Sequence, residues 1–211
     1  MEPTVTVGID LGQKVDPTAI VVTQAHQPAG YRDVRYSVRE FGRLPLGTQY
    51  PAVYTAVVQV LDGLAALGIR KPTVIVDATG ATAAVDGLRV EVQGRCRLVA
   101  ATFTHGDSLV AEPYGFDTAS VGKAYLVNLL QVLIQSGRLE LPPNKPDAGA
   151  MMRELQDYEI HIDQDANDRY GAFKVGSHDD LVTALGLSVL KVRSTRQYHQ
   201  EYDAVSWINY T

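Results

Sequence analysis

The chain has 211 residues, 45% hydrophobic and 20% charged, a balance typical of one globular domain with a sizeable core. Its single cysteine, Cys96, excludes an intramolecular disulfide and a thiolate metal cage, and no apolar run reaches the roughly 18–20 residues that span a bilayer. The formal net charge of −5 argues mildly against nucleic-acid binding, although carboxylates gathered around divalent cations would give the same sign.

Hydrophobic periodicity along the chain predicts a mixed α/β domain. Alternating or continuous runs of β-branched and apolar residues predict strands at 4–10, 18–25, 31–41, 73–77 and 95–103. Apolar residues at helical spacing predict helices at 50–67, 81–91, 119–136, 146–156 and 181–192. We therefore expect a mixed sheet with helices on its faces.

The C-terminal third adds two features to this core. Residues 158–175 have the pattern of a β-hairpin, inserted before the last helix, and its tip at 163–168 is acidic. Residues 194–211 are polar and aromatic without a clear period, which is typical of a poorly ordered tail or a contact segment. The expected organisation is a domain over 1–193 followed by a tail.

Two aspartates follow apolar strands at the point where each strand ends. Asp10 ends the first strand, and Asp77 ends the short run Thr-Val-Ile-Val. Sites in open α/β sheets collect beyond the carboxyl ends of such strands, and like charges held close together need a cation between them. Oxygen ligands select hard ions, so we expect Mg²⁺ or Mn²⁺ at this edge.

Asp179 and Asp180 supply a third element, because they open a helix whose remaining turns are apolar. Adjacent helical residues point about 100° apart, so one of the pair would face the ions while the other binds a second ion or supports a neighbour. The alternative is that these acids only stabilise the helix N-terminus, with Ser177 as the N-cap.

Asp16, six residues after Asp10, is either an auxiliary metal ligand or a turn residue at an Asp-Pro corner. The chemistry that fits these carboxylates is phosphodiester hydrolysis with two divalent ions.

These residues carry a resemblance to a known family. Residues 8–12 (GIDLG) with 16–19 (DPTA) resemble the first motif of the nuclease domain of tailed-bacteriophage terminase large subunits. Residues 74–77 (VIVD) look like the second motif and 178–185 (HDDLVTAL) like the third, and Lys123 also matches that pattern.

The resemblance implies an RNase H-like, resolvase-related fold that cleaves concatemeric viral DNA during genome packaging. Carried over by position, the metal ligands would be Asp10, Asp77 and one or both of Asp179 and Asp180. The implied partners are double-stranded DNA, a packaging ATPase domain, a portal and a small terminase, in the cytoplasm of an infected bacterial host and without a membrane.

One departure from the family is the lack of an N-terminal packaging ATPase, which indicates an isolated nuclease domain or a stand-alone relative. Two alternatives stay open. A resolvase-type nuclease outside packaging would use the same residues. A single-lobe relative of actin-like or sugar-kinase ATPases would use Asp10-Leu11-Gly12 and Asp77-Ala78-Thr79-Gly80 as phosphate loops, although such ATPases need two lobes.

Basic residues suggest where DNA would bind. Arg35, Arg39 and Arg43 are evenly spaced along the third strand and its exit, which predicts one shared face. Lys123 lies on an otherwise apolar helix, and His178 precedes the acidic pair. The further candidates are Arg95, Arg97, Lys191, Arg193 and Arg196. The alternative for any one arginine is a solvated edge-strand charge.

Overall fold

The computed structural model describes residues 2–12, 14–111, 117–157, 159–162, 168–171 and 179–192. Its centre is an eight-stranded mixed sheet in the order β6-β7-β5-β4-β1-β2-β3-β8. The strands are β1 (Thr4–Asp10), β2 (Ala19–His26), β3 (Arg35–Arg43), β4 (Thr73–Asp77), β5 (Arg97–Thr104), β6 (Leu109–Ala111), β7 (Thr118–Gly122) and β8 (Leu139–Glu140). A separate two-stranded sheet pairs β9 (Glu159–Ile162) with β10 (Asp168–Gly171).

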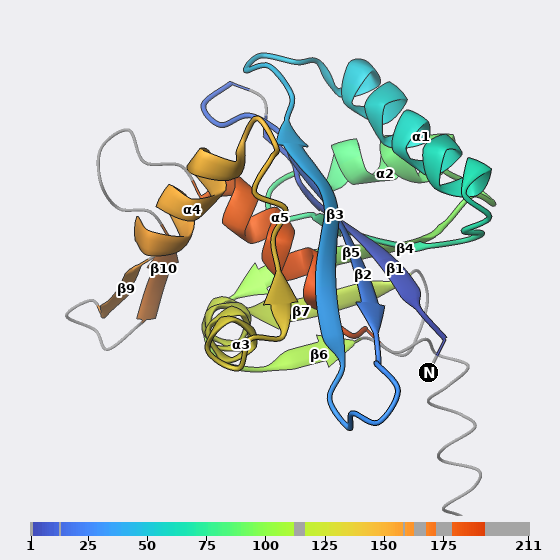
Figure 1. Ribbon diagram of the computed structural model, residues 1–211. Helices are drawn as coiled ribbons and strands as arrows, with labels where there is room; N and C mark the ends of the chain where they lie inside the picture. The colour runs from blue at the N-terminus through green and yellow to red at the C-terminus, as the bar shows by residue number, and fades with distance from the viewer. Residues whose placement is uncertain are drawn as a thin grey trace, which may run out of the picture.

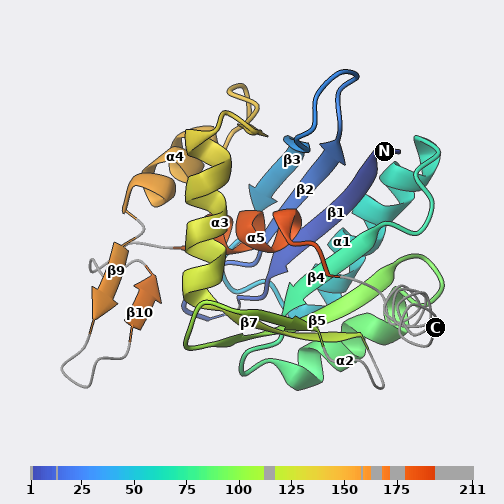
Figure 2. The same cartoon turned by 90° about the horizontal axis from the view of Figure 1, so that it is seen from below.

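Helices cover both faces of the large sheet (Figures 1 and 2). One face carries α1 (Tyr50–Ala66) and α2 (Thr82–Glu91). The other carries α3 (Lys123–Gln135), α4 (Ala148–Asp157) and α5 (Asp180–Val189). Each face has its own buried apolar cluster, which is how a sheet with two covered faces forms its core.

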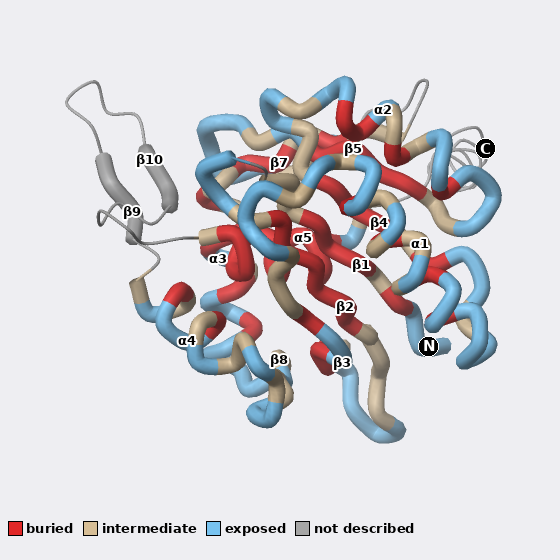
Figure 3. Tube along the Cα trace, turned by 90° about the horizontal axis from the view of Figure 1, so that it is seen from above, coloured by how far each residue is buried: buried red, intermediate tan, exposed pale blue. Residues whose placement is uncertain are grey.

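Helix α5 is the most deeply buried helix of the described chain, since all ten of its residues are buried (Figure 3). It crosses the sheet at Gly8 of β1, where an added Cβ would lie 2.0 Å from the carbonyl oxygen of Ala184. The hydroxyls of Thr23 on β2 and Ser188 on α5 are 2.7 Å apart and share a hydrogen bond. The glycine thus allows a close approach that fixes α5 against β1 and β2.

The register of the central strands places Asp10 beside Asp77. β1 and β4 are parallel, and Ile9 is paired with Val76, one residue before each aspartate. The side chains of Ile9 and Val76 belong to the core under α1 and α2. Because successive residues of a strand point to opposite faces, both aspartates face the α5 side at the carboxyl edge of the sheet.

The mixed sheet, the flanking helices and the hairpin before α5 are confirmed. The expected helix at 119–136 was wrong in its first four residues, which belong to β7 between β5 and β6. Small β6 and β8 were not expected, because their short segments lack an alternating pattern of useful length. The hairpin tip at 163–167 and the tail from 193 onward lie outside the described residues. None of the described helices is long and apolar enough to cross a membrane.

Candidate active site

A cleft of about 450 Å³ opens at the carboxyl edge of the central strands. It contains four carboxylates and two lysines among its lining residues, which are Asp10, Leu11, Gly12, Lys14, Val15, Asp16, Asp77, Phe103, Lys123, Asp179 and Thr183. Elements far apart in the sequence therefore bring Asp10, Asp77 and Asp179 to one cleft, with Asp16 at its loop side.

Burial and neighbouring carboxylates both disfavour the charged form of Asp10. Burial is the largest cause of a pKa of Asp10 well above its usual value, and four neighbouring carboxylates raise it further, those of Asp77, Asp179, Asp180 and Asp16. A carboxyl group in this position gains from a nearby cation more than any exposed acid would.

Asp77 is held in place by its own turn. Its Oδ1 accepts a hydrogen bond of 2.8 Å from the backbone N–H of Thr79, and the Thr79 hydroxyl accepts one of 2.9 Å from the N–H of Phe103 on β5. Burial raises the pKa of Asp77 and Asp179 adds to the increase, while Thr79 and the ammonium of Lys123 oppose it. Overall the pKa of Asp77 stays raised, so its carboxyl group is protonated more readily than that of an exposed acid.

Asp16 sits on a closed loop. The N–H of Gly12 donates to the Thr18 hydroxyl at 3.1 Å, and that hydroxyl donates to the carbonyl oxygen of Gly12 at 2.9 Å. A Cβ at Gly12 would lie 2.1 Å from the carbonyl oxygen of Asp16, so the loop requires glycine there. This loop holds Asp16 as a turn residue and also leaves it in the lining of the cleft, so its turn role and its proposed ligand role are compatible.

The two aspartates at the start of α5 lie in different environments. Asp179 is the N-cap residue and lines the cleft, and its side chain makes no capping hydrogen bond to the described first turn. Asp180 is 1% exposed, and its Oδ2 lies 2.5 Å from Nε of Arg43. The geometry favours Asp179 as the residue that faces a metal ion. Ser177, the expected N-cap, lies outside the described residues.

Lys123 begins α3 at the cleft wall. Its Nζ lies 5.7 Å from the ring centroid of Phe103, within the range of a cation–π contact. Its charge also lowers the pKa of Asp77. A cation between an aromatic ring and the carboxylates is well placed to contact a phosphate.

The prediction that Arg35, Arg39 and Arg43 share one face is wrong. A β-bulge on β3, where the register to β2 shifts between Val22 and Thr23, leaves Arg43 on the α5 face, beside Asp180. Arg39 is on the other face, where it donates to Gln24 Oε1 at 2.7 and 3.0 Å.

Arg35 contacts Glu140 at 3.8 Å and lies 5.4 Å from the ring of Tyr31. Contact of Arg35 and Arg39 with DNA stays a prediction, as it does for His178, which lies outside the described residues. Two of the further candidates have acidic partners, since Arg95 pairs with Asp62 and Arg97 with Asp117.

The donor set fits a hard divalent cation, because every acidic group of the cleft offers carboxylate oxygen. No group of three or more His, Cys, Asp or Glu side chains among the described residues is gathered closely enough to hold an ion as the side chains stand. Burial is the first cause of the raised pKa of Asp10, and the neighbouring carboxylates raise that pKa further. Carboxylates that face one cleft repel one another until a cation lies between them.

The sequence interpretation missed several residues of the site. Lys14 and Thr183 line the cleft, and Glu154 of α4 contacts the start of α5. The sequence offered a signal for Thr183, because it lies four residues after Asp179 and so one helical turn away. In the structure its N–H donates to the Asp179 carbonyl at 2.8 Å. Glu154 had none, because an acid on a short amphipathic helix is typical of a solvated surface. Burial raises the pKa of the Cys96 thiol to about 11, which argues against a cysteine nucleophile.

Comparison with solved structures shows which known fold the chain has. The large terminase nuclease from thermophilic phage G20c is similar over 89% of this chain and 81% of its own, with 16% identity and a TM-score of 0.59. The chain has the fold of a terminase nuclease domain.

Two further structures agree with this assignment. The G20c nuclease with bound magnesium has 17% identity and a TM-score of 0.55, with 89% of this chain and 80% of that chain covered. The human cytomegalovirus terminase nuclease domain, soaked with manganese, has 15% identity and a TM-score of 0.55, with 87% and 80% covered. No protein-family model matches the sequence, and no curated protein matches it significantly.

Proposed function

We propose that this protein is a divalent-metal-dependent DNA endonuclease. The observation that carries the proposal is the convergence of Asp10, Asp77 and Asp179 from two adjacent strand ends and a helix start into one cleft. The raised pKa of Asp10 adds support, because such a site is destabilised until a cation neutralises it. The metal-bound structures of proteins with this fold point the same way.

In this proposal Asp10, Asp77 and Asp179 hold two Mg²⁺ or Mn²⁺ ions, with Asp16 as an auxiliary ligand. The ions would supply an activated water and stabilise the charge on the leaving oxygen of a phosphodiester. The protein would contribute the fixed geometry of its strand-end carboxylates. Lys123 and Lys14, on the walls of the same cleft, would bind the non-bridging oxygens of the scissile phosphate.

The finer function we propose is cleavage of concatemeric double-stranded viral DNA during genome packaging, in the cytoplasm of an infected bacterium. It rests on the fold shared with terminase nucleases and on the motifs around Asp10, Asp77 and Asp179. The proposed partners are a packaging ATPase domain, a portal and a small terminase. A resolvase-type nuclease would act with the same carboxylates, so the substrate must separate the two.

The test is incubation of supercoiled plasmid with the protein and Mn²⁺, in parallel with a four-way DNA junction. We expect the plasmid to be nicked and linearised without ATP, and the junction to be no better a substrate than a duplex of equal length. Cleavage confined to the junction would favour the resolvase alternative. ATP turnover without nicking would favour the ATPase alternative and contradict the nuclease proposal.

A further inference from the structure

The start of α5 is capped by a residue from another helix. Oε2 of Glu154 on α4 accepts hydrogen bonds from the backbone N–H groups of Leu181 and Val182, at 3.0 and 3.2 Å. These N–H groups have no partner within their own helix, and a carboxylate there also interacts favourably with the helix dipole. Glu154 is 6% exposed, so the contact is buried and fixes the helix start firmly.

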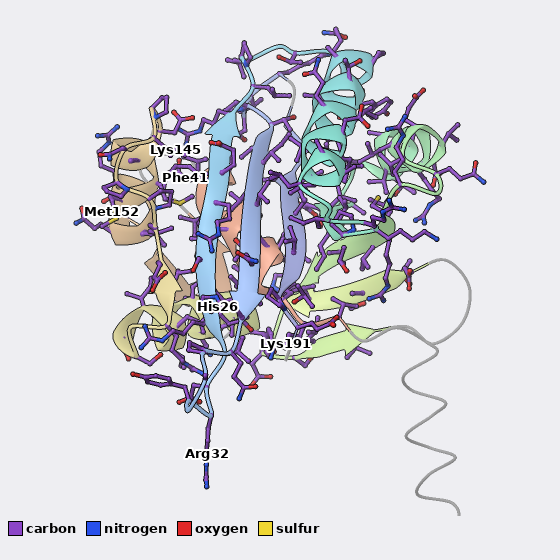
Figure 4. All side chains as sticks on the ribbon, turned by 45° about the vertical axis from the view of Figure 1, so that its right-hand side comes forward. His26, Arg32, Phe41, Lys145, Met152 and Lys191 are labelled. Carbon is purple, nitrogen blue, oxygen red and sulfur yellow. The ribbon has the colours of Figure 1, made fainter. Side chains whose placement is uncertain are left out.

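Arg43 joins this cap to the acidic pair. Its guanidinium holds Asp180 through Nε at 2.5 Å and Nη2 at 3.3 Å, and it also forms an ion pair with Glu154. The Arg43 backbone N–H donates to Asp147 Oδ2 at 3.1 Å, which ties the end of β3 to the start of α4. The segment before α4 makes a second contact with β3, since Nζ of Lys145 (Figure 4) lies 2.6 Å from Oε2 of Glu40.

The three charged side chains come from three elements and meet at the first turn of α5. A planar guanidinium that binds two oxygens of one carboxylate fixes its orientation as well as its position. Asp180 is turned to Arg43, and the residue before it is the N-cap, whose backbone is not helical and whose side chain takes a direction of its own. Asp179 is that residue, and it lines the cleft.

We propose that Arg43 and Glu154 are positioning residues that hold the start of α5, so that Asp179 and not Asp180 serves as the metal ligand of this helix. The inference rests on the proposed function, because a choice between Asp179 and Asp180 as ligand matters only if the cleft binds metal. Arg43 and Glu154 do not themselves line the cleft. Arg43 then acts inside the protein and not at the DNA surface.

The test compares Glu154→Gln with Glu154→Leu in two measurements. Gln keeps a carbonyl oxygen for the two N–H groups, whereas Leu fills similar space without an acceptor. Hydrogen exchange of the amides at 181 and 182, without metal, reports on the helix start. Calorimetric titration with Mn²⁺ reports on the ligands. Arg43→Lys, which keeps the charge but not the two-pronged geometry, replaces the Leu variant if that variant does not fold.

We expect Glu154→Leu to speed exchange at 181 and 182 and to weaken Mn²⁺ binding about tenfold or more, the usual effect of removing an outer-shell partner. Glu154→Gln should stay within about threefold of the wild type for both measurements. Faster exchange with unchanged Mn²⁺ affinity would show a merely structural role and overturn the inference. A wild-type protein that binds no Mn²⁺ would instead overturn the proposed function, and the inference with it.

Discussion

Asp10 and Asp77 end adjacent parallel strands, one residue beyond the paired Ile9 and Val76, and both carboxyl groups have raised pKa values. The sheet therefore forces two acids together at its carboxyl edge, and their position is fixed by backbone pairing. A cation that binds between two carboxylates held in this way contacts both of them and offsets their repulsion.

We expect Asp77→Asn to reduce plasmid cleavage by at least about 100-fold, because loss of a direct ligand should exceed the 10–100-fold effect of losing an outer-shell partner. The metal-free protein should become more stable, since a repelled charge is removed. Cleavage assays with Mn²⁺ and thermal melting with excess chelator measure the two effects. An Asp77→Asn protein as active as the wild type would refute the role of this residue.

The raised pKa of Asp10 predicts how metal-free stability depends on pH. Folding disfavours the ionised form, so this contribution is fully favourable below the unfolded pKa of about 3.8 and is lost as pH rises through the higher folded value. Between those limits the Asp10→Asn variant should lose less stability with rising pH than the wild type. Denaturant unfolding in chelator across this window measures the difference, and parallel curves would contradict the prediction.

The same shift predicts that metal binding releases protons. A carboxyl group must be ionised to bind the ion, so Mn²⁺ affinity should fall as pH decreases through the folded pKa of Asp10. Calorimetry in buffers of different ionisation enthalpy measures the protons released. We expect the wild type to release more protons on binding Mn²⁺ than Asp10→Asn does. Equal release by both proteins would show that the proton comes from a group other than Asp10.

Gly8→Ala should destabilise the protein by about 1–3 kcal/mol, the usual cost of overpacking. The added Cβ would lie 2.0 Å from the carbonyl oxygen of Ala184 and 2.6 Å from the nitrogen of Ser188, both backbone atoms of α5. Since α5 must move away from β1, Asp179 should also be displaced and Mn²⁺ binding weakened. Gly63→Ala on α1 is the control, because nothing beyond its chain neighbours and the backbone of its own helix lies within 4 Å of the added Cβ.

Lys123→Met should raise KM for DNA more than it lowers kcat, since Lys123 is proposed to bind phosphate in the ground state as well as the transition state. The salt dependence of DNA affinity should also become less steep, by about one unit of slope. Arg70→Met, at an exposed loop position before β4, is the charge-matched control. Equal losses of affinity in both variants would indicate a nonspecific charge effect.

The sequence was sufficient to predict the order of most elements and the place of Asp10 and Asp77, because strand-end acids after apolar runs are a local pattern. It could not separate Asp179 from Asp180, whose difference depends on a guanidinium 137 residues away. The bulge on β3 was equally invisible, and it reversed the face of Arg43. These features depend on tertiary contacts, which periodicity does not record.

The central claim is that Asp10, Asp77 and Asp179 bind divalent metal ions in one cleft. Anomalous diffraction from a crystal soaked in Mn²⁺ tests it most directly. We predict manganese peaks in the cleft, with carboxylate oxygens of all three residues within about 2.0–2.3 Å. Peaks confined to other acidic sites, or a cleft that stays empty at saturating Mn²⁺, would contradict the assignment.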